Sequence, residues 1–149
     1  MIRSMRKVAL VAAMATAAAA QAACGGGGGV SSDVDDYITA LSSYADTLCG
    51  CFAEFGYNTK DECLADAFQA PTAAERDCIV AAYESDSTAA DNLSCLLSVQ
   101  ATYNSCVSSS LVCTDDTSLD DCDTQASAAA ENCPALPAAV DTAVQDCFQ

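Results

Sequence analysis

The sequence of 149 residues is strongly acidic, with 21 Asp and Glu against 5 Lys and Arg, and it contains no His and no Trp. Such an excess of negative charge repels phosphate backbones, so it excludes nucleic-acid binding. The absence of His removes the usual general base near neutral pH and the commonest nitrogen ligand for metals. We therefore expect no cofactor, and an enzyme is the least favoured class of function.

The N-terminal residues have the layout of a secretory signal peptide. A basic start is followed by an apolar run from Val8 to Ala20 and by small residues before Cys24. The run is too short and too rich in Ala for a membrane-spanning helix, which needs about 20 strongly apolar residues. We predict that residues 1–23 are a signal peptide, that the protein is exported, and that no later segment spans a membrane.

The junction Gln21-Ala22-Ala23-Cys24 resembles the lipobox of bacterial lipoproteins, with Gln21 in place of the usual aliphatic residue. The resemblance covers only the leader and its junction. It implies that Cys24 receives a diacylglycerol, becomes the new N-terminus and anchors the chain to a membrane. Gly25 after this Cys implies sorting to the outer membrane of the cell envelope. Residues 24–31 then form a lipidated Cys and a flexible Gly-rich tether.

Ordinary cleavage after Ala20-Gln21-Ala22 is the alternative, because this is an A-x-A site of the kind that secreted proteins use. The number of cysteines favours lipidation. The chain has 11 Cys, so a lipid on Cys24 leaves an even number for disulfides, whereas the secreted form keeps one unpaired thiol. A secreted protein stays open as the alternative.

Residues 32–149 are predicted to form one Cys-rich helical domain. Its fold class is all-α, a small disulfide-stapled bundle of about five to six helices without significant sheet, because no segment shows sustained alternation of apolar and polar residues. The first helix spans residues 31–52, where apolar residues recur at steps of three and four. Ser32 and Asp35 are its expected N-terminal cap.

Capping residues and prolines mark the later helices. Thr59 and Thr72, each followed three residues later by Glu, predict capping boxes that open the second and third helices. Apolar periodicity places a fourth helix at residues 87–108 and a fifth at residues 117–134. Pro137 suits the first turn of a sixth helix.

The spacing of four cysteines predicts two disulfides. Cys95 and Cys106 are eleven residues apart, as are Cys122 and Cys133. Eleven residues make about three helical turns, so each pair lies on one face of its helix. Because the two helices are joined by a short loop, they are expected to be antiparallel neighbours. We predict the bridges Cys95–Cys133 and Cys106–Cys122.

The partners of the other six cysteines are less constrained: Cys49, Cys51, Cys63, Cys78, Cys113 and Cys147. We expect the first two to face the second and third helices and to bond to the next two in the chain. That assignment leaves the last two for each other. The core is rich in Ala and poor in large apolar residues, so we expect these bridges to stabilise it.

Two kinds of reactive site are weighed and disfavoured. Cys49-Gly50-Cys51 has the form of a dithiol, but reactive thiols need an electropositive setting that this acidic chain lacks. A weak Ca²⁺ candidate is the densest acidic run: Asp115, Asp116, Asp120, Asp121 and Asp123. The run does not fit the EF-hand spacing, and acids at the start of a helix are expected from the helix dipole alone.

A tethered, cross-linked, non-enzymatic domain is most compatible with a binding or interaction module, whose ligand is a protein or a small molecule that the sequence does not identify. A structural or protective component of the cell surface is the alternative.

Overall fold

A computed structural model describes residues 29–115 and 117–149, and over these residues it contains helices and no strand. The predicted all-α, disulfide-stapled bundle is therefore confirmed. The elements are α1 (Val30–Leu48), a 3-10 turn η1 (Cys49–Cys51), α2 (Lys60–Ala67), α3 (Ala73–Glu84), α4 (Ser87–Ser110), α5 (Asp120–Ala130) and α6 (Ala138–Asp146).

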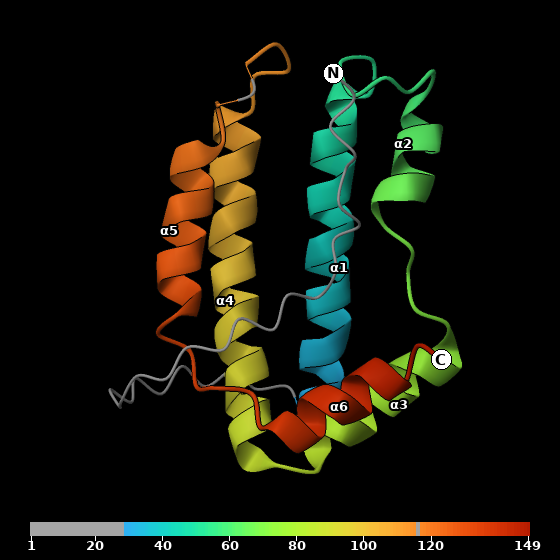
Figure 1. The fold of residues 1–149 in the computed structure, drawn as a ribbon, viewed down its shortest axis with the longest axis vertical. Coiled ribbons are helices and arrows are strands. Elements are labelled where there is room, and N and C mark those ends of the chain that lie inside the picture. The colour runs from blue at the N-terminus through green and yellow to red at the C-terminus, as the bar shows by residue number, and fades with distance from the viewer. Residues whose placement is uncertain (1–28, 116) are drawn as a thin grey trace.

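The helices α1, α2, α4 and α5 lie roughly parallel to the long axis of the molecule, whereas α3 and α6 lie across one end (Figure 1). The helix α4 packs against both α1 and α5, and the short helix α2 packs against η1. The helices α3 and α6 pack on each other across the end at which α1 begins, which we call the base. The connections η1–α2 and α4–α5 lie at the opposite end.

Two of the predicted helix starts are present. Thr72 caps α3 with a complete capping box: its hydroxyl accepts the amide of Glu75, and the Glu75 carboxylate accepts the amide of Thr72 at 2.6 Å. The Thr59 hydroxyl likewise accepts the amide of Glu62 and so caps α2. The Glu62 carboxylate, however, accepts the amide of Asn58 and not that of Thr59. The predicted capping box of α2 is therefore only half formed.

The start of α1 differs from the prediction. Gly29 occupies the N-cap position and has no side chain to form a cap, and the helix begins at Val30. Ser32 lies inside the first turn, where its amide donates to the carbonyl of Gly29 at 2.8 Å. The predicted cap of Ser32 and Asp35 was therefore wrong, because the helix begins before Ser32 and both residues lie within it.

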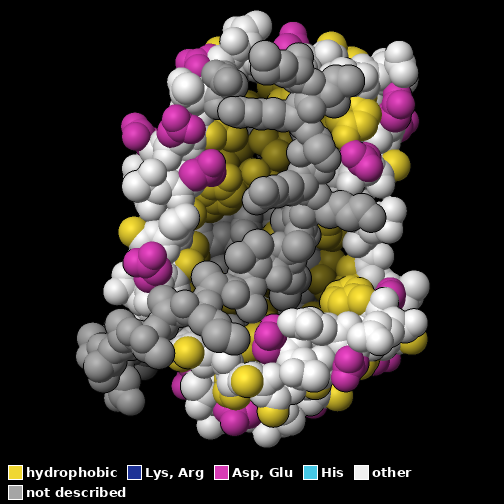
Figure 2. All heavy atoms as spheres, in the orientation of Figure 1, with side chains coloured by type: hydrophobic (Ala, Val, Ile, Leu, Met, Phe, Trp, Pro, Cys, Tyr) yellow, Lys and Arg dark blue, Asp and Glu magenta, His cyan; other side chains and the backbone are white. Residues whose placement is uncertain are grey.

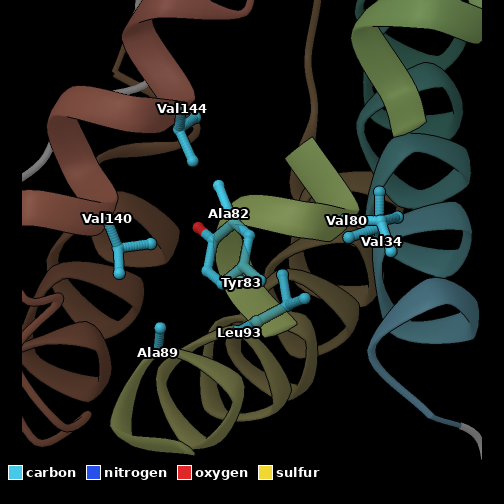
Figure 3. Packing of buried hydrophobic residues seen from close by; sticks show 8 residues of the cluster. All are labelled: Val34, Val80, Ala82, Tyr83, Ala89, Leu93, Val140 and Val144. Carbon is cyan, nitrogen blue, oxygen red and sulfur yellow. The ribbon is translucent and has the colours of Figure 1, made fainter. Parts of the chain in front are cut away.

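The apolar core lies at the base. Eight buried residues from α1, α3, α4 and the last helix form one cluster around the Tyr83 ring (Figure 3): Val34, Val80, Ala82, Tyr83, Ala89, Leu93, Val140 and Val144. Tyr83 is 5% exposed, and its burial raises its pKa to about 12. Because the other members are aliphatic and mostly small, this core buries little apolar area for a chain of this length.

In the half of the bundle away from the base, disulfides and polar contacts link the helices. Among its fully buried side chains are Cys49, Cys51 and Cys63 beside Val107. Disulfides thus occupy positions that large apolar residues fill in bigger domains, as expected for a small exported fold.

A chain of hydrogen bonds connects α1, α4 and α5. The hydroxyl of Tyr44 on α1 lies 3.3 Å from that of Tyr103 on α4, which donates to the Asp123 carboxylate on α5 at 2.6 Å. The two rings pack with their centres 5.2 Å apart. Burial, together with the bond to Asp123, raises the pKa of Tyr103 above its ordinary value. The hydroxyls therefore stay protonated and keep the helices in register.

Candidate binding surface

Five disulfides cross-link the described residues, and two of them are the bridges that the eleven-residue spacing predicts. Cys95 bonds to Cys133 with their Cα atoms 5.6 Å apart, and Cys106 bonds to Cys122 at 5.8 Å. Both lie along the contact between α4 and α5. They staple the antiparallel hairpin near its turn and again beyond the end of α5, because Cys95 and Cys106 share one face of α4. The fifth helix is shorter than the predicted residues 117–134, so Cys133 lies just after α5 and not on it.

Of the other three bridges, only Cys49–Cys63 follows the predicted order. The expectations that Cys51 bonds to Cys63 or Cys78, and Cys113 to Cys147, were wrong. The structure bonds Cys51 to Cys113, with 5.2 Å between their Cα atoms, and Cys78 to Cys147, with 5.7 Å.

The reason for this exchange is the length of the helices. The 19 residues of α1 rise by about 28 Å. Cys51 therefore lies far from α3, which crosses the base, and cannot reach Cys78. The 24 residues of α4 return the chain over a comparable distance and bring Cys113 to the same end as Cys51. Cys147 is left at the base beside α3.

The bridge between Cys51 and Cys113 joins the two connections at the end opposite the base. It is flanked by two of the three large apolar side chains that are exposed among the described residues: Phe55, which is 39% exposed, and Val112, which is 51% exposed. We call this arrangement of Phe55, Val112 and the Cys51–Cys113 bridge the distal tip. The third exposed side chain, Phe148, lies near the C-terminus.

Local hydrogen bonds fix the Phe55 side of the distal tip. The amide of Phe55 donates to the carbonyl of Cys51 at 3.3 Å, which keeps the ring within one turn of the bridge. Gly56 follows with a φ of 86°, a left-handed conformation that favours Gly and lets the chain turn toward α2.

The Val112 side is fixed by hydrogen bonds as well. The amide of Val112 donates to the hydroxyl of Ser118 at 3.2 Å, and its carbonyl accepts the amide of Asp115 at 2.9 Å. Both loops are therefore braced by the bridge and by hydrogen bonds of their own, and they carry the two exposed apolar side chains.

Sequence analysis did not single out Phe55 or Val112. The available signal was that each lies just beyond the end of a helical apolar face and close to a cysteine. That signal becomes informative only once Cys51 and Cys113 are known to be bonded to each other.

The basic side chains of the described chain are all paired with carboxylates. Lys60 forms an ion pair with Asp46 at 2.6 Å, and Arg76 pairs with Asp35 at 2.7 Å and Asp77 at 2.9 Å. Both basic residues of the described chain are thus committed to carboxylates. On the face in Figure 2, Asp and Glu lie mostly along the margins, hydrophobic side chains gather toward the middle, and no Lys or Arg is visible.

The Ca²⁺ candidates do not come together. No group of three or more His, Cys, Asp or Glu side chains is placed to hold a metal ion within residues 29–115 and 117–149. Asp115 accepts the amide and the hydroxyl of Thr117, which lowers its pKa, while Asp123 accepts the hydroxyl of Tyr103. Asp120 and Asp121 begin α5 as exposed residues, and Asp116 lies outside the described residues.

Two hollows flank α5, and neither encloses a ligand-sized space. The first, between α4 and α5, measures about 160 Å³ and is lined by Tyr103 and the Cys106–Cys122 bridge. Small-molecule sites usually occupy about 300–1,000 Å³. The second, about 430 Å³, is an open depression beside Asp123 and Glu131. Neither hollow therefore has the form of an enclosed small-molecule site.

The predicted signal peptide (residues 1–23) and the lipidated Cys24 lie outside the described residues, as does most of the tether. In the described part, no helix combines the length and the apolar composition needed to cross a bilayer. No family model, curated protein or solved structure matches the chain, so its function has to be inferred from the geometry of the molecule.

Proposed function

We propose that the chain is the precursor of an exported lipoprotein, anchored to the outer membrane through Cys24, whose mature domain is a non-enzymatic binding module. The lipobox-like junction, the Gly-rich tether and the even number of remaining cysteines support the anchor. Five disulfides are typical of proteins that fold in an oxidising, exported environment.

One observation carries the binding role: the distal tip and the start of α1 lie at opposite ends of the bundle (Figure 1). A chain tethered through its N-terminus is held at the base. Helices about 28–36 Å long then place Phe55 and Val112 on the side away from the anchor. Exposed apolar side chains on a braced surface, directed away from the membrane, suit contact with a partner.

The anchor is tested by the intact mass of the membrane-extracted protein after thiol alkylation without reduction. We expect a chain that starts at Cys24, carries acyl mass and has no alkylated thiol. A lipid-free chain that starts near Ala23 and carries one alkylated Cys would refute the anchor and establish the secreted alternative.

The binding role is tested by photo-crosslinking in cells of the native host. A photoreactive residue is placed at position 55 or 112, and at position 148 as the matched control, since Phe148 is equally exposed but lies near the C-terminus. Discrete adducts from the two tip positions and none from the control are expected. Adducts that are absent, or identical at all three positions, would contradict the proposal.

The alternative, a structural or protective surface component, is favoured by a separate observation: every helix of the described chain carries exposed carboxylates. It predicts no position-specific adducts in the same experiment, so the two candidates are separated by one measurement.

A further inference from the structure

The distal tip carries exposed apolar side chains and is surrounded by acidic residues. Phe55 lies one turn after Cys51 and Val112 lies directly before Cys113, so both exposed side chains belong to the loops that one disulfide joins. Large apolar side chains elsewhere in the described chain are mostly buried or half-buried. An apolar patch with a polar rim is characteristic of an interaction site. The chemistry of the rim then indicates which kind of partner fits.

The rim of the tip is acidic. Glu54 precedes Phe55, Asp115 lies in the loop after Val112, and Asp120 and Asp121 open α5 at the same end; all four are exposed. None of them forms an ion pair among the described residues. Lys60, at the start of α2, is the basic residue closest in the chain to Phe55, and it is bonded to Asp46.

This charge restricts the occupant. A second copy of the chain would bring a matching set of carboxylates to the contact, and an anionic lipid surface or a nucleic acid would be repelled. A partner with positive charges gains from the unpaired carboxylates, and a partner with apolar side chains covers Phe55 and Val112. A partner segment that carries both basic and apolar side chains therefore complements the acidic rim and the two apolar side chains of the tip.

The tip is also prepared for binding before the partner arrives. The Cys51–Cys113 bridge joins the two loops, and the Cys49–Cys63 bridge fixes the turn that leads into the first of them. Because these bridges restrict both loops before binding, association costs less conformational entropy than it would for loops without them.

We propose that the distal tip binds a cationic amphipathic segment of a partner protein, with its apolar side chains against Phe55 and Val112 and its Lys or Arg residues against the acidic rim. This inference rests on the proposed binding function and names the class of partner. Burial of the two apolar side chains provides the specificity, and the carboxylates accelerate encounter and make the affinity dependent on salt.

The test uses the full processed protein in zwitterionic nanodiscs, with protein-free nanodiscs as the blank. The probe is a short helical peptide of Leu and Lys with one apolar face. Two control peptides are a scrambled sequence of the same composition, which has no continuous apolar face, and a version with Glu in place of Lys. Affinity is measured by titration at low and at high salt.

We expect saturable binding of the amphipathic Lys peptide, with an affinity that falls by about tenfold or more when the salt is raised from about 0.05 M to about 0.5 M. The double variant F55S/V112S is expected to lose about tenfold or more in affinity. The control variant Phe148→Ser removes an apolar residue outside the tip that is as exposed as Val112, and it should leave the affinity unchanged. The double variant E54Q/D115N is expected to weaken the salt dependence.

The inference is overturned if F55S/V112S binds as well as the parent protein, or if the scrambled or the Glu peptide binds as tightly as the amphipathic Lys peptide. The crosslinking experiment in cells distinguishes a failure of the proposed partner class from a failure of the binding function. Adducts specific to positions 55 and 112 without peptide binding would refute the partner class and keep the binding function. The absence of such adducts would refute the binding function itself.

Discussion

The bridge between Cys78 and Cys147 allows the contribution of a disulfide to be tested against the geometry. It fastens α6 to α3 at the base and closes a loop with a sequence separation of 69. Cys78 is exposed and Cys147 half-buried, so replacing both by Ala leaves little void behind. The double variant C78A/C147A therefore isolates the restriction that the bridge places on the unfolded chain.

The expected loss of unfolding free energy follows from the size of the loop. Closing a loop of this length restricts the unfolded chain by about 4 kcal/mol at room temperature. Small domains are stable by only about 5–15 kcal/mol, so this loss is a large part of the total. The helix α6 has nine residues and would not persist alone. Only Val140, Val144 and their neighbours would then hold it on the core.

The assay is chemical denaturation followed by circular dichroism, together with amide hydrogen exchange. The control variant C95A/C133A removes a bridge with a sequence separation of 38, for which the same reasoning gives a similar loss of about 4 kcal/mol. The first variant should increase exchange in α6, and the second in the α4–α5 hairpin. A loss below about 1 kcal/mol, or unchanged exchange in α6, would refute the reasoning.

Three further outcomes follow from single groups. Thr72→Ala removes the hydroxyl that caps α3 and should lower the unfolding free energy by about 1 kcal/mol, measured by denaturation; no change would mean that the capping box is dispensable. Burial raises the pKa of Tyr83 to about 12. The stability contributed by its buried neutral phenol should therefore be fully present below pH 10 and should decline as the pH rises toward 12. Absorbance of the ionised phenol follows this change, and ionisation with an ordinary midpoint would contradict the burial of Tyr83. The Arg76 hydrogen bond lowers the pKa of Asp35, and the Thr72 amide lowers that of Glu75, so the contribution of both carboxylates should be lost as the pH falls below about 4, with Asp35→Asn abolishing part of that dependence.

Local features of the chain were predictable because their causes are local. The capping residues Thr59 and Thr72 need only the amides three positions ahead of them. The bridges Cys95–Cys133 and Cys106–Cys122 required only a helical period and a short turn between two helices. Gly29 was missed as the start of α1, because a glycine N-cap has no side chain to mark it.

The sequence by itself therefore determined the helical class, the positions of most helices, the stapled hairpin and the acidic surface. The tertiary structure alone decided that Cys51 meets Cys113, and with that bridge it created the distal tip. The physical reason is that hydrogen bonding and periodicity act over a few residues, whereas this contact depends on the summed lengths of α1 and α4 and on α3 crossing the opposite end of the bundle.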